Sequence, residues 1–388
     1  MSRRAGIIVL DGLGVGEAHD AAAWGDRGSA TLGNVVRATP DLDLPNLVAL
    51  GIGHCGDAGL PAAAQPRCAH GTAEPASQGK DSTTGHWELC GLILERPFPT
   101  FPEGFPAELL SRFSELTGRG VLANIAGSGT RILDDFGARH VQTGDWIIYT
   151  SADSVFQVAA HEDVVPLGEL YAACAVAREL LTGEVGVSRV IARPFAGMPG
   201  AWQRTARRKD FSLEPPGRTL LDALAAAHQP VVGVGKVDDL FAGRGVRSIH
   251  TATNQEAYDL ISDALETMRR GLLFVNVIEF DQTWGHRNDV AGFAGGLREL
   301  DRWIPRLLGA VGKEDLIILT ADHGNDPTTP STDHARERVP VLVLGGGVRP
   351  VSIGARQTFA DVGQTVAEFL GVPQLDAGTS FLDEVWAG

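Results

Sequence analysis

The sequence predicts an α/β fold in which helices cover a mainly parallel sheet. Short apolar runs and longer amphipathic stretches alternate along the whole chain of 388 residues. The short runs are mainly apolar, as expected for strands that are buried on both faces of a sheet. The longer stretches repeat apolar residues at intervals of three and four, which is typical of helices. This alternation favours helices packed on a parallel sheet.

Each element follows from this pattern. Strands are predicted at residues 6–10, 146–149, 189–192, 230–235, 272–280, 316–320 and 339–344. Helices are predicted at residues 166–181, 219–228, 254–268 and 290–308. The chain contains no repeat of fixed period, which argues against a solenoid or a propeller.

Two segments rich in proline and glycine divide the chain, at residues 96–106 and 213–218. About 120 residues lie between them, enough for a small independent domain. We therefore predict a discontinuous core formed by residues 1–96 and 218–388, with an inserted α+β domain at 97–217. Two sequential domains are the alternative, but they would separate Asp11 from the polar cluster near the C-terminal end.

The composition excludes several classes of protein. The chain has 48 acidic and 33 basic residues and a net charge of -15, which argues against a general nucleic-acid binder. The apolar run at residues 5–10 is too short for a signal peptide or a membrane span. The four cysteines form no CxxC pair, as expected for reduced thiols. We expect a cytoplasmic protein with no nucleic-acid or membrane partner.

The densest polar cluster lies at residues 320–326, followed by Asp333 and His334. Asp322 and His323 come directly after the predicted strand 316–320, and ligands bind at such strand ends in open α/β sheets. An Asp-His pair is also common in turns that only cap or hydrogen-bond the backbone. The cluster alone leaves both interpretations open.

Two further segments offer polar side chains near the N-terminal end. Asp11 follows the strand at residues 6–10 and precedes two glycines. The polar segment 79–88 contains several hydroxyl groups at the start of a helix, where backbone N–H groups favour a phosphate. Helix capping is the competing explanation for both segments.

Asp281 and His286 add a fourth segment, since Asp281 follows an apolar run and a turn leads to His286. Carboxylates mixed with imidazoles suit Mn²⁺, Zn²⁺ or Fe²⁺. The set contains no cysteine, which disfavours a structural zinc site. A hydroxyl bound to such a metal is a better nucleophile because the metal lowers its pKa.

Several motifs carry a more specific signal. They are DSTTGHWE at 81–88, YTSADSVFQVAAHE at 149–162, ARPFAG at 192–197, WGHRND at 284–289, TADHGND at 320–326 and TDHARE at 332–337. In this order and spacing, the chain resembles the phosphopentomutase family of the alkaline phosphatase superfamily over nearly its whole length. The resemblance implies an alkaline phosphatase-like core and an inserted cap.

The resemblance also implies roles for individual residues. Thr84, just before Gly-His-Trp-Glu, is then the residue that becomes phosphorylated. One metal ion is held by Asp11, Asp322, His323 and Thr84, and the other by Asp281, His286 and His334. The implied substrate contacts in the cap are Ser154, Val158, Arg193 and Arg208.

The implied reaction interconverts ribose 1-phosphate and ribose 5-phosphate, and the matching 2-deoxyribose pair, through a bisphosphate intermediate. The implied cofactors are two Mn²⁺ ions, with Zn²⁺ or another divalent metal as an alternative, and glucose 1,6-bisphosphate or ribose 1,5-bisphosphate as primer. The oligomeric state stays open, a monomer being one option.

The chain departs from the family pattern at two positions. Glu279 stands where the family usually has aspartate, on the same predicted strand face as Asp281, and we expect it to alter metal preference or rate. Ile125 replaces a lysine and removes a positive charge from the cap. Lys236 ends the strand 230–235 and could face the site, but a surface position is the default expectation for its side chain.

Two competing functions remain at this stage. A phosphatase or phosphodiesterase on the same scaffold would pass the phosphoryl group to water rather than to a sugar. A binding protein without catalytic activity would gain no covalent phosphate.

Overall fold

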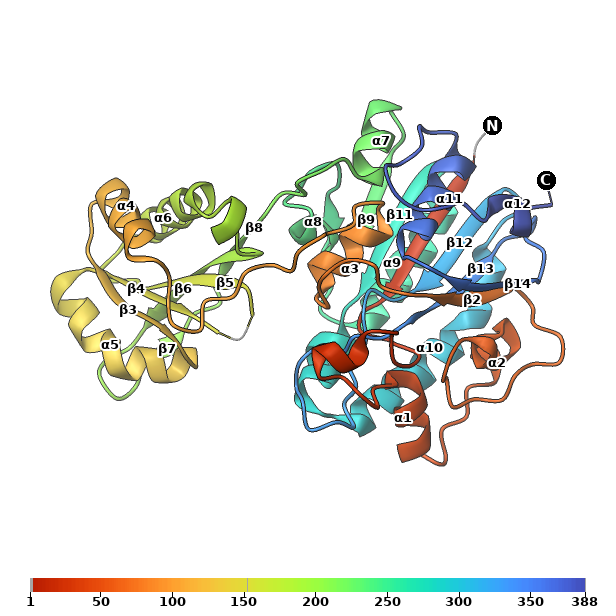
Figure 1. Cartoon of the computed structure of the whole chain (residues 1–388), viewed down its shortest axis with the longest axis horizontal. Helices are drawn as coiled ribbons and strands as arrows, with labels where there is room; N and C mark the ends of the chain where they lie inside the picture. The colour runs from red at the N-terminus through yellow and green to blue at the C-terminus, as the bar shows by residue number, and fades with distance from the viewer. Residues whose placement is uncertain (1–2, 152, 388) are drawn as a thin grey trace. The chain divides into compact units, whose positions relative to one another are not determined.

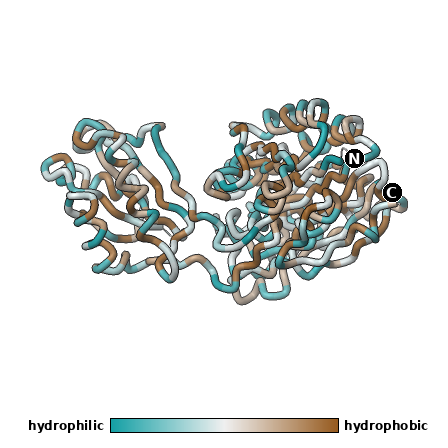
Figure 2. Tube along the Cα trace, turned by 90° about the horizontal axis from the view of Figure 1, so that it is seen from above, coloured by the Kyte–Doolittle hydropathy of each residue, from teal (hydrophilic) through white to brown (hydrophobic). Residues whose placement is uncertain are grey.

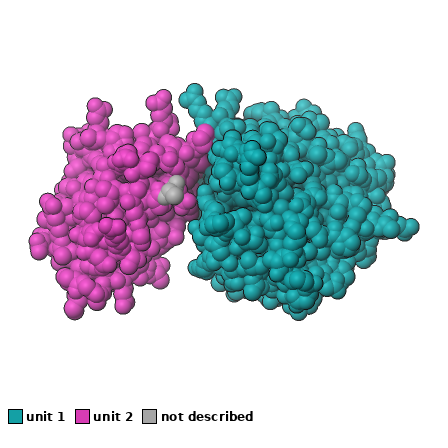
Figure 3. Space-filling model, turned by 60° about the horizontal axis from the view of Figure 1, so that its bottom comes forward, with its two compact units in different colours: residues 1–96, 215–388 teal, residues 97–214 magenta. Residues whose placement is uncertain are grey.

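The computed structural model describes residues 3–151 and 153–387, which divide into two compact units (Figure 3). Unit 1 comprises Met1–Arg96 and Pro215–Gly388, and unit 2 comprises Pro97–Glu214. The chain passes from one unit to the other after Arg96 and after Glu214, in or beside the two segments rich in proline and glycine. Within the described ranges, no helix has the length and apolar character needed to cross a membrane.

An eight-stranded sheet forms the centre of unit 1, in the order β10-β9-β11-β1-β12-β13-β2-β14. Its strands are β1 (Arg4–Leu10), β2 (Ala69–Ala73), β9 (Val231–Val234), β10 (Ser248–Ile249), β11 (Gly271–Val277), β12 (Asp315–Thr320), β13 (Val339–Leu344) and β14 (Ser352–Arg356). Strand β13 runs antiparallel to both of its neighbours, and the other pairs are parallel. The mainly parallel sheet of the prediction is thus confirmed.

Helices cover this sheet on both faces, since every residue of β11 and β12 is buried. One packed group consists of α3 (Ser82–Leu89), α7 (Leu220–Ala226), α8 (Val237–Leu240) and α11 (Ala360–Leu370). A second consists of α1 (Thr31–Ala38), α2 (Pro45–Leu50), α9 (Asn254–Thr267) and α10 (Val290–Ala310). The remaining short helices are η1 (Ala21–Trp24), η2 (Ile52–His54), η4 (Phe280–Trp284), η5 (Gly285–Arg287) and α12 (Leu382–Val385). In Figure 2, hydrophobic (brown) and hydrophilic (teal) segments alternate along the trace.

Unit 2 has a mixed sheet in the order β3-β4-β5-β6-β7, with β8 paired to β6. Its strands are β3 (Val121–Ala126), β4 (Trp146–Thr150), β5 (Val155–His161), β6 (Arg189–Ala196), β7 (Gln203–Arg204) and β8 (Lys209–Ser212). Helices α4 (Ala107–Thr117) and α6 (Leu167–Leu180) lie on one side of the sheet, and α5 (Gly129–Thr143) lies on the other (Figure 1). The short helix η3 (Gly183–Val185) follows α6. Unit 2 therefore has a hydrophobic core of its own.

One predicted strand is too long. The run 272–280 leaves the sheet at Val277, and Glu279 already has helical backbone angles. Asp281 consequently lies in the irregular turn η4 rather than on a strand. Glu279 and Asp281 do not share a strand face, so the reason given for a link between Glu279 and the metal is wrong.

Candidate metal centre

The polar residues of unit 1 come together because three neighbouring parallel strands end at the same edge of the sheet. Val9 of β1 is paired with Thr320 of β12, and Leu10 is paired with Val277 of β11. Asp11 follows β1 directly, Asp322 lies two residues after the end of β12, and Asp281 lies four residues after the end of β11. Gly12 N donates a hydrogen bond to Asp322 Oδ1 at 3.2 Å, which fixes the turn after β1 against the turn after β12.

At this edge of the sheet, two groups of side chains each present ligand atoms within 4.8 Å of one another. The first is Asp281, His286 and His334, in which both imidazole Nε2 atoms lie 3.3 to 3.4 Å from Asp281 Oδ1. The second is Asp11, His323 and the same Asp281. Asp322 Oδ2 lies 3.4 Å from His323 Nε2. All six charged ligand-type residues predicted from the sequence thus lie at one site.

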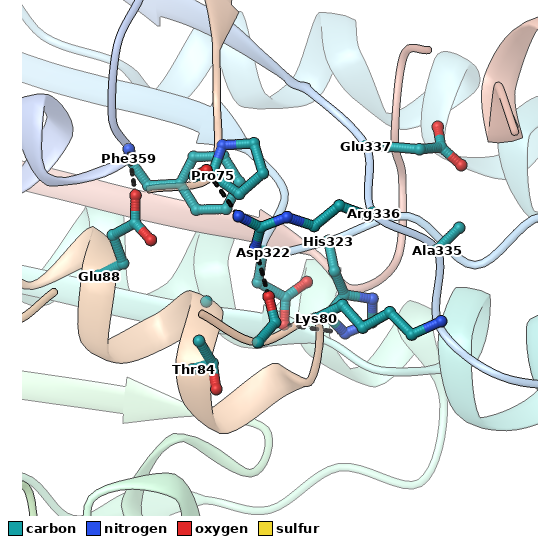
Figure 4. Close-up of a pocket in the computed structure, with 12 residues that line it drawn as sticks. Pro75, Lys80, Thr84, Glu88, Asp322, His323, Ala335, Arg336, Glu337 and Phe359 are labelled. Atoms are coloured by element: carbon teal, nitrogen blue, oxygen red, sulfur yellow. Dashed lines mark hydrogen bonds and ion pairs between the residues drawn. The ribbon is translucent and has the colours of Figure 1, made fainter. Parts of the chain in front are cut away.

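The structure places a different hydroxyl at this site from the one predicted. Ser82 Oγ lies 3.4 Å from Asp11 Oδ1 and 3.2 Å from His323 Nε2. Thr84 Oγ1 instead donates to Asp81 Oδ2 at 2.6 Å and points away from His323 (Figure 4). The two residues occupy the first and third positions of α3, about 200° apart around the helix axis, so they face opposite sides.

Lys236 also belongs to the centre, although its position at a strand end suggested a surface side chain. Its ammonium group lies 2.7 Å from Asp11 Oδ2, 3.9 Å from Asp281 Oδ2 and 3.4 Å from Ser82 Oγ. The turn after β9 depends on Gly235, whose φ of 81° is left-handed and where a Cβ would meet Asn276 O at 2.2 Å. In the sequence, a Gly-Lys pair at the end of a predicted strand is a weak indication that the lysine turns toward the centre.

The charges of the centre shift the pKa of its members strongly. Burial lowers the pKa of His323, but the Asp322 charge and the hydrogen bond to Asp11 outweigh that effect and raise it to about 10. Burial likewise opposes the charged form of His286, whose contact with Asp281 raises its pKa to about 9. Burial disfavours ionised Asp11, yet the neighbouring Lys236 holds the Asp11 pKa well below its ordinary value.

These residues fit a divalent metal. The carboxylates of Asp11 and Asp322 are buried, and His323 Nε2 lies 3.3 Å from Asp11 Oδ1 and 3.4 Å from Asp322 Oδ2. The Lys236 ammonium adds a positive charge beside these carboxylates. Mixed carboxylate oxygens and imidazole nitrogens suit Mn²⁺ or Zn²⁺. Metal binding then requires that the imidazoles lose their protons.

Further residues orient the ligand side chains. Asn325 Nδ2 donates to Asp281 Oδ1 at 2.7 Å. His86 Nδ1 lies 3.0 Å from Asp322 Oδ2, and its Nε2 lies 3.3 Å from Asn276 Nδ2. Such outer contacts hold the ligands of metal sites in place.

Glu279 takes no part in this shell. Its carboxylate accepts a hydrogen bond from Asn254 N at 2.6 Å, while Glu279 N donates to Asn254 Oδ1 at 2.9 Å. These two bonds join the start of α9 to the end of β11. The contacts assign Glu279 to helix capping rather than to metal selection.

Two of the four predicted substrate contacts serve the fold of unit 2. Val158 is fully buried in the hydrophobic core beneath α4 and α6, so its side chain has no surface to offer a ligand. Ser154 Oγ donates to Pro99 O at 2.5 Å and accepts from Ser188 N at 3.2 Å. Val158 lies on a strand position that faces the core, and the half-buried Ser154 uses its hydroxyl for backbone groups of its own unit.

The two arginines lie in a basic cluster of unit 2. Arg193 Nε donates to Gln157 Oε1 at 3.0 Å, and burial together with the nearby Arg208 and Arg204 lowers the Arg193 pKa. Arg208 pairs with Asp210. The sequence interpretation missed Arg204, which hydrogen-bonds to the Tyr149 hydroxyl and lies against Gly129 at the start of α5. Ile125 is 42% exposed on the edge strand β3.

Comparisons with known proteins find relatives that match nearly the whole chain. A family model described as the metalloenzyme superfamily matches residues 3–374. The chain is 50% identical over 389 residues to a protein of Dictyoglomus turgidum named phosphopentomutase, covering 100% of this chain and 99% of that protein. It is 53% identical over 388 residues to a protein of that name from Anaeromyxobacter dehalogenans, covering 99% and 100%. A phosphoglycerate mutase structure from Leishmania mexicana matches with 13% identity and a TM-score of 0.49, covering 98% of this chain and 97% of that one.

Proposed function

The chain belongs to the phosphopentomutase family within the metalloenzyme superfamily, and on that premise we propose that it interconverts ribose 1-phosphate and ribose 5-phosphate, together with the 2-deoxyribose pair. We further propose that the reaction passes through a phosphoserine at Ser82 and a sugar bisphosphate. The observation that carries this assignment is the position of Ser82 Oγ among Asp11, His323 and Lys236.

Ser82 meets the requirements of a phosphoryl carrier better than Thr84 does. Its hydroxyl faces the ligand-type residues, whereas the Thr84 hydroxyl is used to close the N-terminal cap of α3 with Asp81. The backbone N–H groups in the first turn of α3 favour an anion at Ser82. The Lys236 ammonium, 3.4 Å from Ser82 Oγ, supplies a positive charge for phosphoryl oxygens.

Each turnover consists of two phosphoryl transfers. In the first, the bond between phosphorus and Ser82 Oγ breaks, a bond to the free hydroxyl of the sugar phosphate forms, and the proton of that hydroxyl ends on Ser82 Oγ. In the second, Ser82 Oγ takes the other phosphoryl group of the bisphosphate, and its proton ends on the product hydroxyl. A bisphosphate such as glucose 1,6-bisphosphate or ribose 1,5-bisphosphate loads Ser82 at the start.

We assign one divalent ion to Asp11, Asp322, His323 and the Ser82 hydroxyl, and a second to Asp281, His286 and His334. When bound, such ions lower the pKa of the serine hydroxyl and offset the charge on phosphoryl oxygens. Mn²⁺ is the proposed ion, and the same donors also admit Zn²⁺.

The distal phosphate of the sugar is assigned to the basic cluster of unit 2. Arg193, Arg204 and Arg208 all act on the buried Tyr149, so their charges converge on one part of the unit. Guanidinium groups bind phosphate through paired N–H donors, and a bound anion also relieves their mutual repulsion. We omit Ser154 and Val158 from these contacts because their side chains are used within unit 2.

The test is to map the phosphorylated residue. The protein is incubated with Mn²⁺ and glucose 1,6-bisphosphate, and digested peptides are read by mass spectrometry. We expect phosphate on Ser82, no label in Ser82→Ala, and retained label in Thr84→Val. Label on Thr84 would restore the assignment made from the sequence.

A second assay separates the mutase from a hydrolase. With ribose 5-phosphate as substrate, we expect ribose 1-phosphate to form and little inorganic phosphate to be released. Release of mostly inorganic phosphate would instead indicate a phosphatase or phosphodiesterase on this scaffold.

A further inference from the structure

Arg336 is the most completely bonded charged side chain beside the metal centre, and the proposed reaction assigns it no role. It is only 1% exposed. Its guanidinium donates to Ser77 O at 2.6 Å, to Gly79 O at 2.5 Å and to Pro75 O at 2.9 Å. The remaining donors bind the Asp20 carboxylate at 3.0 and 3.1 Å. All five N–H donors of the group are therefore used.

These bonds connect two segments that carry chemistry. The carbonyls bound by Arg336 belong to residues 75–79, which lead through Lys80 and Asp81 into Ser82 (Figure 4). Arg336 itself follows His334 by two residues. Lys80 adds a second connection, because its ammonium lies 3.1 Å from Asp26 and 3.3 Å from Asp333. The two segments are thus held against each other at several points.

The bonding requires arginine at this position. Three carbonyls and one carboxylate converge on a planar group, and Trp24 packs against that plane with its ring centroid 5.1 Å from the guanidinium carbon. A lysine ammonium has three donors on one atom and cannot reach all of these acceptors. Buried carbonyls without a donor would be costly, so residues 75–79 would move.

We infer that Arg336 is a positioning residue for phosphoryl transfer, which holds the segment leading to Ser82 in register with the segment that bears His334. The inference rests on the proposed role of Ser82. It predicts an effect on the rate of transfer rather than on the binding of substrate, because a displaced nucleophile lowers the rate steeply.

The test compares Arg336→Lys with Arg4→Lys. Arg4 is a matched control because it is also largely buried, binds Asp315 and the carbonyls of Leu265 and Met268, and lies at the opposite end of β1 from Asp11. The full chain with Mn²⁺ is assayed for kcat, for KM with ribose 5-phosphate, and for the rate of label incorporation at Ser82. Thermal unfolding is recorded for each variant, and assays are run well below both transitions.

In Arg336→Lys we expect kcat and the labelling rate to fall about 10- to 100-fold, with KM changed less than about threefold. Arg4→Lys should lower the unfolding temperature and leave kcat within about twofold. If Arg336→Lys does not fold, Asp20→Asn replaces it in the test, because that change removes the charge of the carboxylate that binds Arg336. A loss of kcat of about two- to tenfold is then expected.

Two results would overturn the inference. One is a kcat in Arg336→Lys within about twofold of the native value, and the other is an equal loss in Arg4→Lys. Failure of the proposed function looks different, since the unaltered protein would then carry no label at Ser82.

Discussion

The Lys236 ammonium occupies a place where a metal ion is expected to supply positive charge, so replacing it gives a sharp test of the centre. In Lys236→Met the stem keeps most of its volume, but the charge 2.7 Å from Asp11 Oδ2 and 3.9 Å from Asp281 Oδ2 is lost. Asp11 is fully buried and cannot regain solvation from water. We expect the metal-free protein to be destabilised.

The size of the effect follows from the geometry. At an effective dielectric constant of about 20, unit charges 2.7 Å apart attract by about 6 kcal/mol. The Lys236 side chain is 25% exposed, so solvent screens part of this attraction, and desolvation offsets more. Breaking a buried pair typically costs about 3–5 kcal/mol, and we take the lower end, about 3 kcal/mol. For a unit of this size that corresponds to a fall in unfolding temperature of about 6 °C.

The assay is thermal unfolding of the native protein and Lys236→Met after chelation, repeated with saturating Mn²⁺. Bound metal neutralises the same carboxylates, so the gap between the two proteins should shrink to about 2 °C or less. Lys313→Met is the control, because Lys313 is exposed and should give no difference in either condition. A gap of equal size with and without Mn²⁺, or no gap at all, would refute the reasoning.

Three further predictions concern the buried Glu337 and Val158 and the half-buried Glu279. Burial raises the pKa of Glu337 from 4.5 to about 7, so the folded state binds the proton of this carboxyl more tightly than the unfolded state does. Between pH 4.5 and pH 8 the native protein should therefore lose up to about 3 kcal/mol of stability relative to Glu337→Gln. Unfolding of both proteins at several pH values checks this. Val158→Ala should lower the stability of unit 2 by about 2 kcal/mol and leave KM for ribose 5-phosphate unchanged. A raised KM without a loss of stability would instead support direct contact between Val158 and the sugar. Glu279→Asp should weaken the bond to Asn254 N and cost about 1 kcal/mol, and an altered ratio of Mn²⁺ to Zn²⁺ activity would contradict that assignment.

Much of the centre could be predicted from the sequence because strand order and strand ends are local properties. Parallel strands present their carboxyl ends at one edge, so aspartates at or shortly after these strand ends lie near one another. Asp11 and Asp322 follow this rule within two residues of their strands, and Asp281 is brought to the same edge by the turn η4. The helix at Asn254–Thr267 was predicted with nearly the same bounds, since its apolar period and its cap are both local signals.

Other assignments depended on contacts that no local pattern encodes. Ser82 and Thr84 differ by two residues in a segment with several hydroxyls, and only the phase of α3 against β1 and β12 decides which one faces Asp11 and His323. Arg204 was passed over because a basic run usually forms a solvated loop, although its partner Tyr149 comes from another strand.

The sequence by itself determined the class of fold, the residues that can hold metal, and the family, because each of these is recorded in composition, period and motif order. The tertiary structure alone decided that Ser82 rather than Thr84 faces the centre, that Lys236 pairs with Asp11, and that Val158 belongs to a hydrophobic core. The physical reason is common to all three. A side chain's surroundings are set by the packing of distant segments, and about half a turn of a helix or one glycine after a strand is enough to redirect it.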